Sequence, residues 1–499
     1  MERAKIDLSA RTCPNREERL RSIKAFYGDA DELIQSATQG GVPWRNRAFQ
    51  QNGGCVNSST MMRLASVRDG VVLSHAPIGC SGMIYGYREV YQNISPSEGR
   101  PPADFHWIST NLRENDLVFG GEGKLARTLL EAEARYRPEA IFVLSSCASG
   151  IVGDDLEGVV ASTQPKVKAR IVPVHCEGFR SQVPQTGFDA LWHAVLKHLA
   201  SRSGNRQPDL VNLVAPFSVT WGDRRELIRL LGRLGLRANI VPEFASVADL
   251  RQVSEAALTV TTCQSFGDYL QKALQDNFGV PFLRDPVPIG ISQTCDWLRR
   301  IAEATGRTDR VEAVIAEELA AVAPHLARLR EALSARKVKI FVNAGQGRAL
   351  GLPLLAQELG LTVSGISTLE HDELSVDGLK KIRERCGAYK VHVAEYQAAE
   401  QAAIVDALRP DIYTGCPMTG AVYKREAGMA RMHSFRSDPS PEGQQFGFRG
   451  AITYGHVLLR VVSNPSLNKR LAGVTPRPYR PWWYQRNEPL AFVKDGSAA

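Results

Sequence analysis

The chain has 499 residues, of which 43% are hydrophobic and 23% are charged, and its formal net charge is +8. This length exceeds what one hydrophobic core usually serves, and the composition excludes a disordered chain, so we expect several well-packed domains. No stretch reaches the roughly 18 uninterrupted apolar residues of a membrane span, and the charged start has no secretory signal pattern, which together predict a cytoplasmic protein with no membrane partner.

From residue 139 onward, short β-branched runs alternate with longer amphipathic stretches. This alternation is typical of βα units with parallel sheets. The predicted strands lie in EAIFVLSSC, ARIVPVHC, LVNLVAP, ANIVPEF, ALTVTTC, KVKIFVNAG, LTVSGIST, YKVHVAEY and DIYTGC. The predicted helices include residues 224–236, 311–335 and 352–361. The sequence therefore predicts an α/β fold with three doubly wound, Rossmann-like domains.

The domain ranges that we expect are 1–206, 207–333 and 334–499, with the second boundary after a long helical stretch. Residues 464–490 are rich in proline and aromatic residues, which predicts an extended C-terminal tail over another surface. Arginines spread along the chain supply the basic charge, and we interpret this charge as a solvated or protein-docking surface in preference to a nucleic-acid surface.

The nine cysteines are an odd number and form no CxxC pair, which excludes a disulfide framework or a zinc ribbon. Four of them directly follow an apolar β-type run, the place where doubly wound sheets bind ligands. These four are Cys147, Cys176, Cys263 and Cys416. Cys55, in QNGGCVNSS, and Cys80, in SHAPIGCSG, lie among glycines and small residues.

Glycine lets the backbone approach a bulky inorganic ligand, and iron–sulfur clusters are held by thiolates. Cys55, Cys80 and Cys147 are one short of a usual set of four thiolates, so a second polypeptide would supply the rest. Two other readings stay open: small buried thiols, or a cysteine nucleophile at Cys80 with His75 as its base.

Two glycine-rich stretches resemble nucleotide motifs without matching them. DLVFGGEGKL lacks the Ser or Thr after Lys124, which favours a tight turn before a helix. VNAGQGRALG has the spacing GxGxxxG and no acid ends the next predicted strand. Backbone N–H groups that face another anionic ligand stay open for this second stretch.

Taken in order, several segments resemble the α-subunit class of the nitrogenase component 1 family. These segments are HAPIGC, DLVFGGEGKL, SSCASGIVGDDLEGV, IVPVHCEGFR, CQSFGDYLQKALQDNFGVPF and MARMHSFRS followed by FGFRGA. The resemblance implies that Cys55, Cys80 and Cys147 bind a P-type iron–sulfur cluster shared with a homologous β-subunit in an α2β2 heterotetramer. It also implies that Cys263 and His433 hold the two ends of a large active-site metallocluster of unknown heterometal, with Arg88 beside it.

The departures from the family pattern point to an altered active site. Phe188 and Asp189 stand where the family has a pair of histidines, and Pro184 stands in place of a glutamine. Ser265 and Phe266 replace an Arg-Ser pair, and Phe435 replaces a Trp or Tyr. Several polar donors have thus become apolar or acidic, which does not suit N2 or homocitrate.

Among nitrogenase-like reductases, the sequence most resembles the α-subunits of methylthio-alkane reductases. That resemblance implies an oxidoreductase that cleaves C–S bonds of volatile thioethers for sulfur acquisition, with electrons from a separate ATP-hydrolysing iron protein. Arg88 and Phe188 would then shape the catalytic pocket. An N2-reducing nitrogenase of unusual type and a non-catalytic cofactor-assembly scaffold are the alternatives.

Overall fold

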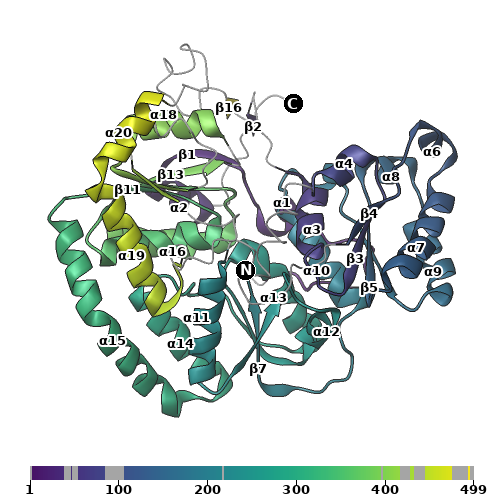
Figure 1. Cartoon of the computed structure of the whole chain (residues 1–499), viewed down its shortest axis with the longest axis horizontal. Coiled ribbons are helices and arrows are strands. Elements are labelled where there is room, and N and C mark those ends of the chain that lie inside the picture. The colour runs from purple at the N-terminus through teal and green to yellow at the C-terminus, as the bar shows by residue number, and fades with distance from the viewer. Residues whose placement is uncertain are drawn as a thin grey trace.

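The structure is a computed structural model of the whole chain, and it describes residues 3–38, 46–47, 54–84, 106–215, 219–394, 397–415, 428–431, 444–474 and 493–494. Three sheets with helices packed around them make up the molecule (Figure 1). None of the helices in these ranges is long and apolar enough to cross a membrane.

The first sheet has four parallel strands in the order β4-β3-β5-β6. Its strands are β3 (Gly70–Ser74), β4 (Trp107–Ser109), β5 (Ala140–Leu144) and β6 (Arg170–Val174). The accompanying helices are α3 (Val56–Leu64), α4 (Ile78–Gly82), α6 (Glu114–Phe119), α7 (Glu122–Tyr136), α8 (Cys147–Val152), α9 (Leu156–Thr163) and α10 (Thr186–His198).

The second sheet is also parallel, in the order β10-β9-β7-β8. Its strands are β7 (Gln207–Val214), β8 (Arg237–Val241), β9 (Ala256–Thr261) and β10 (Phe282–Leu283). The helices that follow along the chain are α11 (Trp221–Arg233), α12 (Val247–Arg251), α13 (Gln264–Phe278), α14 (Ile291–Thr305) and α15 (Thr308–Ser334).

The third sheet has the order β1-β13-β12-β11-β14-β15, and only β1 runs antiparallel to its neighbour. Its strands are β1 (Ala25–Asp29), β11 (Lys339–Asn343), β12 (Thr362–Thr368), β13 (Lys390–Ala394), β14 (Ile412–Gly415) and β15 (Gly428–Arg431). The remaining helices are α1 (Arg16–Leu20), α2 (Ala30–Thr38), α16 (Gln346–Glu358), α17 (Val376–Cys386), α18 (Ala398–Leu408), α19 (Gly447–Ser463) and α20 (Pro465–Val474). A short pair, β2 (Asn46–Arg47) and β16 (Val493–Lys494), joins distant parts of the chain.

All nine predicted strands are present, and the predicted α/β fold with parallel sheets is confirmed. Two expectations need correction. The range 1–206 includes β1, which pairs with β13 of the third sheet. The tail predicted to be extended begins with helix α20, because Pro465 occupies a first helical position, where its missing N–H costs nothing.

Helix α16 begins at Gln346, before the predicted start at residue 352. The stretch contains glycines of low helix propensity, which is why the pattern alone placed the start later. Tertiary packing requires them: a methyl group on Gly351 would lie 2.9 Å from Cβ of Ile289. Local propensity is outweighed here by the close approach of two elements.

Two hydrophobic cores hold the three sheets together. One joins residues of the second and third sheets with α14, α15 and α19. The other joins β5 and β6 of the first sheet with α10 and α13. The starts of α10, α13 and α16 therefore meet near the middle of the molecule, between the sheets (Figure 1).

Candidate functional site

The three glycine-associated cysteines lie beside the first sheet. Cys55 directly precedes α3, Cys80 lies within α4 after β3, and Cys147 is the first residue of α8 after β5. Strands β3 and β5 are parallel neighbours, so their carboxyl ends meet at one edge of the sheet. This topology brings Cys80 and Cys147 to the same edge.

Gly178 lies between two of these cysteines. A methyl group on Gly178 would lie 3.1 Å from Sγ of Cys147 and 3.6 Å from Sγ of Cys55. A side chain at this position would therefore crowd Sγ of Cys147 and contact Sγ of Cys55. Burial raises the pKa of the Cys80 thiol, and the nearby Cys55 and Cys147 raise it further. The three sulfurs are thus within electrostatic reach of one another.

The spacing of these thiols does not fit a single metal ion. Within the described ranges, no three Cys, His, Asp or Glu side chains form a group that could hold one ion. An iron–sulfur cluster differs, because its thiolates bind separate iron atoms around a larger inorganic core. The three thiols, gathered at one edge of the sheet beside a residue without a side chain, fit such a cluster.

Large apolar side chains surround the three cysteines. Residues 78, 83, 118, 119, 151 and 179 expose between 47% and 86% of their surface, and we call them the cysteine-side patch: Ile78, Met83, Val118, Phe119, Ile151 and Phe179. Helices α4, α6 and α8, which carry four of the six, lie together at one end of the molecule, and Met83 directly follows α4 (Figure 1). Large exposed apolar side chains that gather in one place are typical of interaction surfaces and ligand-binding grooves.

Cys263 lies at the carboxyl end of β9, immediately before α13, and is half-buried. Its own N–H donates to Oγ1 of Thr261 at 3.1 Å, which fixes the turn. Burial raises the pKa of its thiol, while the backbone N–H groups of Gly347 and Phe266 act in the opposite direction. A bound metal would take the thiol proton outright, and those two N–H groups would then donate to the thiolate.

The start of α16 packs directly on Cys263. A methyl group on Gly347 would lie 2.3 Å from the Thr262 carbonyl oxygen and 3.2 Å from Cβ of Cys263. The next residue, Arg348, is buried and donates from Nε to Oε1 of Gln445 at 2.6 Å. Its guanidinium also acts electrostatically with Cys263. The glycine-rich turn therefore packs on the thiol, and its buried cation Arg348 also lies 4.0 Å from the carboxylate of the buried Asp223.

Phe188 lies in the first turn of α10 and packs edge-on against Phe266 of α13, with 4.7 Å between ring centroids. Phe188 and Cys263 both pack against the core cluster that contains Phe266. The Arg63 guanidinium lies 5.2 Å from the Phe188 ring and 5.4 Å from the Phe266 ring. Arg63 also forms a 2.9 Å ion pair with the buried Glu243.

Sequence reasoning missed Arg63 and Arg348. Both were visible as single charges in stretches of small or apolar residues, VNSSTMMRL and NAGQGRALG. A stretch of small and apolar residues is expected to be buried, and a single arginine within it then needs a polar partner or a ligand.

Asp189, the residue after Phe188, is fully buried in an ion-pair cluster. Its carboxylate accepts from Nη2 of Arg16 at 2.8 Å and from Nη2 of Arg19 at 2.7 Å. Both arginines come from α1, which begins after the capping residue Asn15. The Asp189 carboxylate is therefore held by two arginines of this chain.

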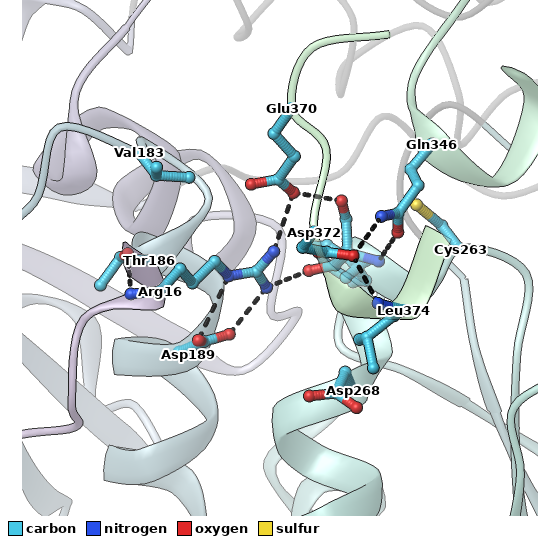
Figure 2. Close-up of polar contacts among 12 residues, drawn as sticks. Arg16, Val183, Thr186, Asp189, Cys263, Asp268, Gln346, Glu370, Asp372 and Leu374 are labelled. Atoms are coloured by element: carbon cyan, nitrogen blue, oxygen red, sulfur yellow. Dashed lines mark hydrogen bonds and ion pairs between the residues drawn. The ribbon is translucent and has the colours of Figure 1, made fainter. Parts of the chain in front are cut away.

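Two buried acids lie on the loop after β12. Burial raises the pKa of Glu370 to about 7, with Arg16 opposing this shift and Asp372 adding to it. Gln346 links this loop to α13, because its Nε2 donates to Asp372 at 3.0 Å and its Oε1 accepts from the Ser265 N–H at 2.7 Å (Figure 2). A charged, hydrogen-bonded shell thus surrounds the helix start that carries Cys263.

Other predicted residues have different positions. Arg88, His433, Cys416 and Phe435 lie outside the described residues. Cys176 is buried, and its Sγ donates to the Ser145 carbonyl oxygen at 3.5 Å, so it is a packed thiol. Pro184 directly precedes Gln185, the capping residue of α10.

Two alternatives from the sequence are not supported by the geometry. The ring nitrogens of His75 contact Asp154 at 2.9 Å and Thr110 at 3.1 Å, which leaves neither nitrogen as a base for Cys80. Lys124 donates to Asp116 at 2.7 Å, as expected of a tight turn and not of a phosphate loop.

A family model described as nitrogenase component 1 type oxidoreductase matches residues 55–464. The chain belongs to this family. The matched range includes both cysteine sites described above and extends through α19.

Relatives within the nitrogenase families carry two different descriptions. The nitrogenase iron-molybdenum cofactor biosynthesis protein NifE of Rippkaea orientalis is 28% identical over 450 residues, which cover 88% of this chain and 90% of that protein. The nitrogenase molybdenum-iron protein alpha chain of Methanothermobacter thermautotrophicus is 26% identical over 417 residues, covering 80% and 85%. The solved structure "Nitrogenase Cp1 at pH 5" shares the fold, with a TM-score of 0.71, 21% identity and coverage of 88% and 93%.

Proposed function

We propose that this chain is the catalytic α-subunit of a cytoplasmic, nitrogenase-like reductase that cleaves C–S bonds of small volatile thioethers. The observation that carries the proposal is the pair of phenyl rings beside Cys263, Phe188 and Phe266, which we call the apolar wall. These two rings pack against each other, and the Asp189 carboxylate forms ion pairs with two arginines. Neither of the two positions that hold histidines in the family then offers a donor, which suits a thioether better than N2.

Cys263 would hold one end of a large iron–sulfur metallocluster, and His433 would hold the other. The half-buried thiol, the backbone N–H of Gly347 that favours its thiolate, and the buried Arg348 within electrostatic reach of it support a metallocluster ligand at Cys263. When bound, the metallocluster supplies the electrons and the site of bond cleavage. This chain orients it through Cys263 and keeps water away with the two phenyl rings.

Cys55, Cys80 and Cys147 would bind a P-type cluster together with thiolates of a homologous β-subunit in an α2β2 assembly. The exposure of Cys80 and the cysteine-side patch support a site that a partner completes. An ATP-hydrolysing iron protein would deliver electrons at this surface. ATP would bind to that protein, because Lys124 of this chain is already paired with Asp116.

The proposed reaction consumes two electrons and two protons for each thioether. The C–S bond breaks, the sulfur leaves as methanethiol, and the carbon fragment leaves as a hydrocarbon. For 2-(methylthio)ethanol the products are ethylene, methanethiol and water, which balances the atoms. The iron protein is the reductant, and the solvent is the source of the protons.

A cofactor-assembly scaffold is the second candidate, and the similarity to NifE proteins favours it. A scaffold releases its metallocluster to another protein and turns over no substrate. An N2-reducing enzyme is the third candidate, because molybdenum-iron alpha chains are about equally similar.

The test is anaerobic purification with the partner subunit, followed by analysis for Fe, S, Mo and V. The complex then receives the iron protein, ATP and 2-(methylthio)ethanol, and ethylene is measured. We expect ethylene and methanethiol in equal amounts. Substantial ammonia from N2, or transfer of the metallocluster to an apo-protein without turnover, would replace the proposal with one of the other two candidates.

A matched pair of variants tests the apolar wall. Phe188→Leu keeps an apolar side chain, whereas Phe188→Asn has a similar size but brings amide donors. We expect Phe188→Leu to retain most of the ethylene formation and Phe188→Asn to lose roughly tenfold, since a mismatched polar group costs on the order of 1–3 kcal/mol. Equal rates in the two variants would contradict the role of the wall.

A further inference from the structure

Arg16 lies at the junction of all three sheets, although it comes from the N-terminal segment. Its guanidinium contacts Asp189 of α10 through Nε at 3.2 Å and Nη2 at 2.8 Å. Nη1 donates to Oε1 of Glu370 at 2.9 Å, and Nη2 also donates to the carbonyl oxygen of Ser265 in α13. In Figure 2 this guanidinium lies between Asp189 and Glu370.

Ser265 is held through each of its polar groups. Its N–H donates to Gln346, its carbonyl oxygen accepts from Arg16, and its hydroxyl donates to Glu370. Ser265 lies two residues after Cys263 and directly before Phe266. The position of the first turn of α13 is therefore set by groups from α1, α16 and the loop after β12.

On the other side of Arg16, Asp189 directly follows Phe188. The backbone N–H of Arg16 also donates to Oγ1 of Thr186 at 3.3 Å, within the same turn of α10. One side chain thus joins the neighbours of Phe188 to the neighbours of Cys263 and Phe266. The two helix starts that carry the phenyl rings are joined by this link and by Nε1 of Trp192, which donates to the Phe266 carbonyl oxygen at 3.0 Å.

We propose that Arg16 is a positioning residue for the cofactor site, which fixes Cys263 and Phe266 of α13 against Phe188 of α10. The inference rests on the proposed function at Cys263. Arg16 is fully buried and uses its planar group to reach two carboxylates and one carbonyl at once. A lysine carries the same charge, but its three N–H donors are on a single nitrogen atom. It therefore cannot make the contacts with Asp189, Glu370 and Ser265 at the same time.

Arg19 provides a matched control. It lies in the same short helix, is also mostly buried, and binds Asp189 and Asp268 at 2.7 and 2.5 Å. Its ion pairs reach neither Ser265 nor Glu370. Asp268 lies in α13 one turn after Gln264, so replacement of Arg19 by lysine disturbs the same buried cluster further along that helix and leaves all three contacts of Ser265 in place.

The first measurement uses the full chain without metal, so that it does not depend on the proposed reaction. Each cysteine is labelled with iodoacetamide, and the labelling rates are read by peptide mass spectrometry. In Arg16→Lys we expect iodoacetamide to label Cys263 roughly tenfold faster. A loss of about 1.4 kcal/mol in local stability raises the population of molecules with an accessible Cys263 tenfold. Cys386, which is also half-buried, should keep its rate.

In Arg19→Lys, the labelling rates of Cys263 and Cys386 should equal those of the natural chain. An unchanged Cys263 rate in Arg16→Lys, or the same increase in Arg19→Lys, overturns the inference. If Arg16→Lys does not fold, Ser265→Ala takes its place, because it removes only the hydroxyl contact with Glu370. It should accelerate Cys263 labelling by roughly threefold, and no acceleration also overturns the inference.

The second measurement is the low-temperature EPR spectrum of the purified complex with its metalloclusters. Arg16→Lys should shift the signal of the active-site metallocluster and leave the signal of the shared cluster unchanged. Arg19→Lys should shift neither, and an identical spectrum in Arg16→Lys counts against the inference. If the complex contains no active-site metallocluster, the proposed function fails, whereas the labelling result still decides the role of Arg16.

Discussion

The two cysteine sites of this chain differ in how they are enclosed. Cys80 is exposed, and the cysteine-side patch around the three thiols consists of large apolar side chains on short helices. Cys263 is half-buried, and buried arginines, carboxylates and amides of this chain surround its helix start. A site that a partner completes exposes apolar surface, whereas a site enclosed by one chain needs internal charge pairing.

The largest expected effect comes from removal of the Cys263 thiol. Cys263→Ala should lower ethylene formation by more than about a hundredfold, since even substitutions outside the ligand set of a metal site cost roughly 10–100-fold. Iron bound by the complex should fall, while the partner subunit stays bound. Cys386→Ala, which removes a half-buried thiol from the end of α17, is the control and should keep both iron and activity. Full activity in Cys263→Ala would place the cofactor elsewhere.

A charge in the cysteine-side patch should act on assembly and leave the Cys263 site intact. Ile151→Asp should weaken association with the partner subunit by roughly 30-fold or more, as expected for a central apolar residue of an interface. Sedimentation of the mixed subunits measures this change. Val474→Asp is the matched control, because Val474 is similarly exposed, 72% against 77% for Ile151, but lies on α20. Equal effects of the two substitutions would show that the patch is not the interface.

The smallest effect should appear in the pH dependence of the buried shell. Burial raises the pKa of Glu370 from the ordinary 4.5 to about 7. Its protonated form therefore stabilises the folded chain below pH 4.5, and this contribution is lost as the pH rises towards 7. The loss is on the order of 3 kcal/mol at most.

Glu370→Gln keeps the shape of this side chain but removes its titration. Urea unfolding of the metal-free chain at pH 5 and at pH 7.5 measures the free energy of unfolding of the natural protein and of Glu370→Gln. The natural protein should lose more stability than the variant as the pH rises. Parallel pH profiles would mean that Glu370 does not hold the proton of the acid pair.

Local patterns were sufficient for most of the fold. The nine predicted strands were recognisable because parallel strands buried on both faces read as continuous apolar runs. The start of α16 was not recognisable, because its glycines are required by packing against Ile289. The helical part of the tail was not recognisable either, because Pro465 lies at a first helical position, where proline is tolerated. The range 1–206 expected for the first domain also contains β1 of the third sheet, because antiparallel pairing with β13 joins residues that are far apart in the chain.

By itself, the sequence determined where cysteines follow strands or stand among glycines, and it predicted that these cysteines carry the chemistry; it also placed a phenylalanine and an aspartate where the family pattern has two histidines. Only the tertiary structure decided what that aspartate does. Arg16 reaches Asp189, Ser265 and Glu370 across 173, 249 and 354 positions of the chain. Periodicity describes contacts within an element, whereas a buried charge finds its partners wherever the folded chain removes water from both.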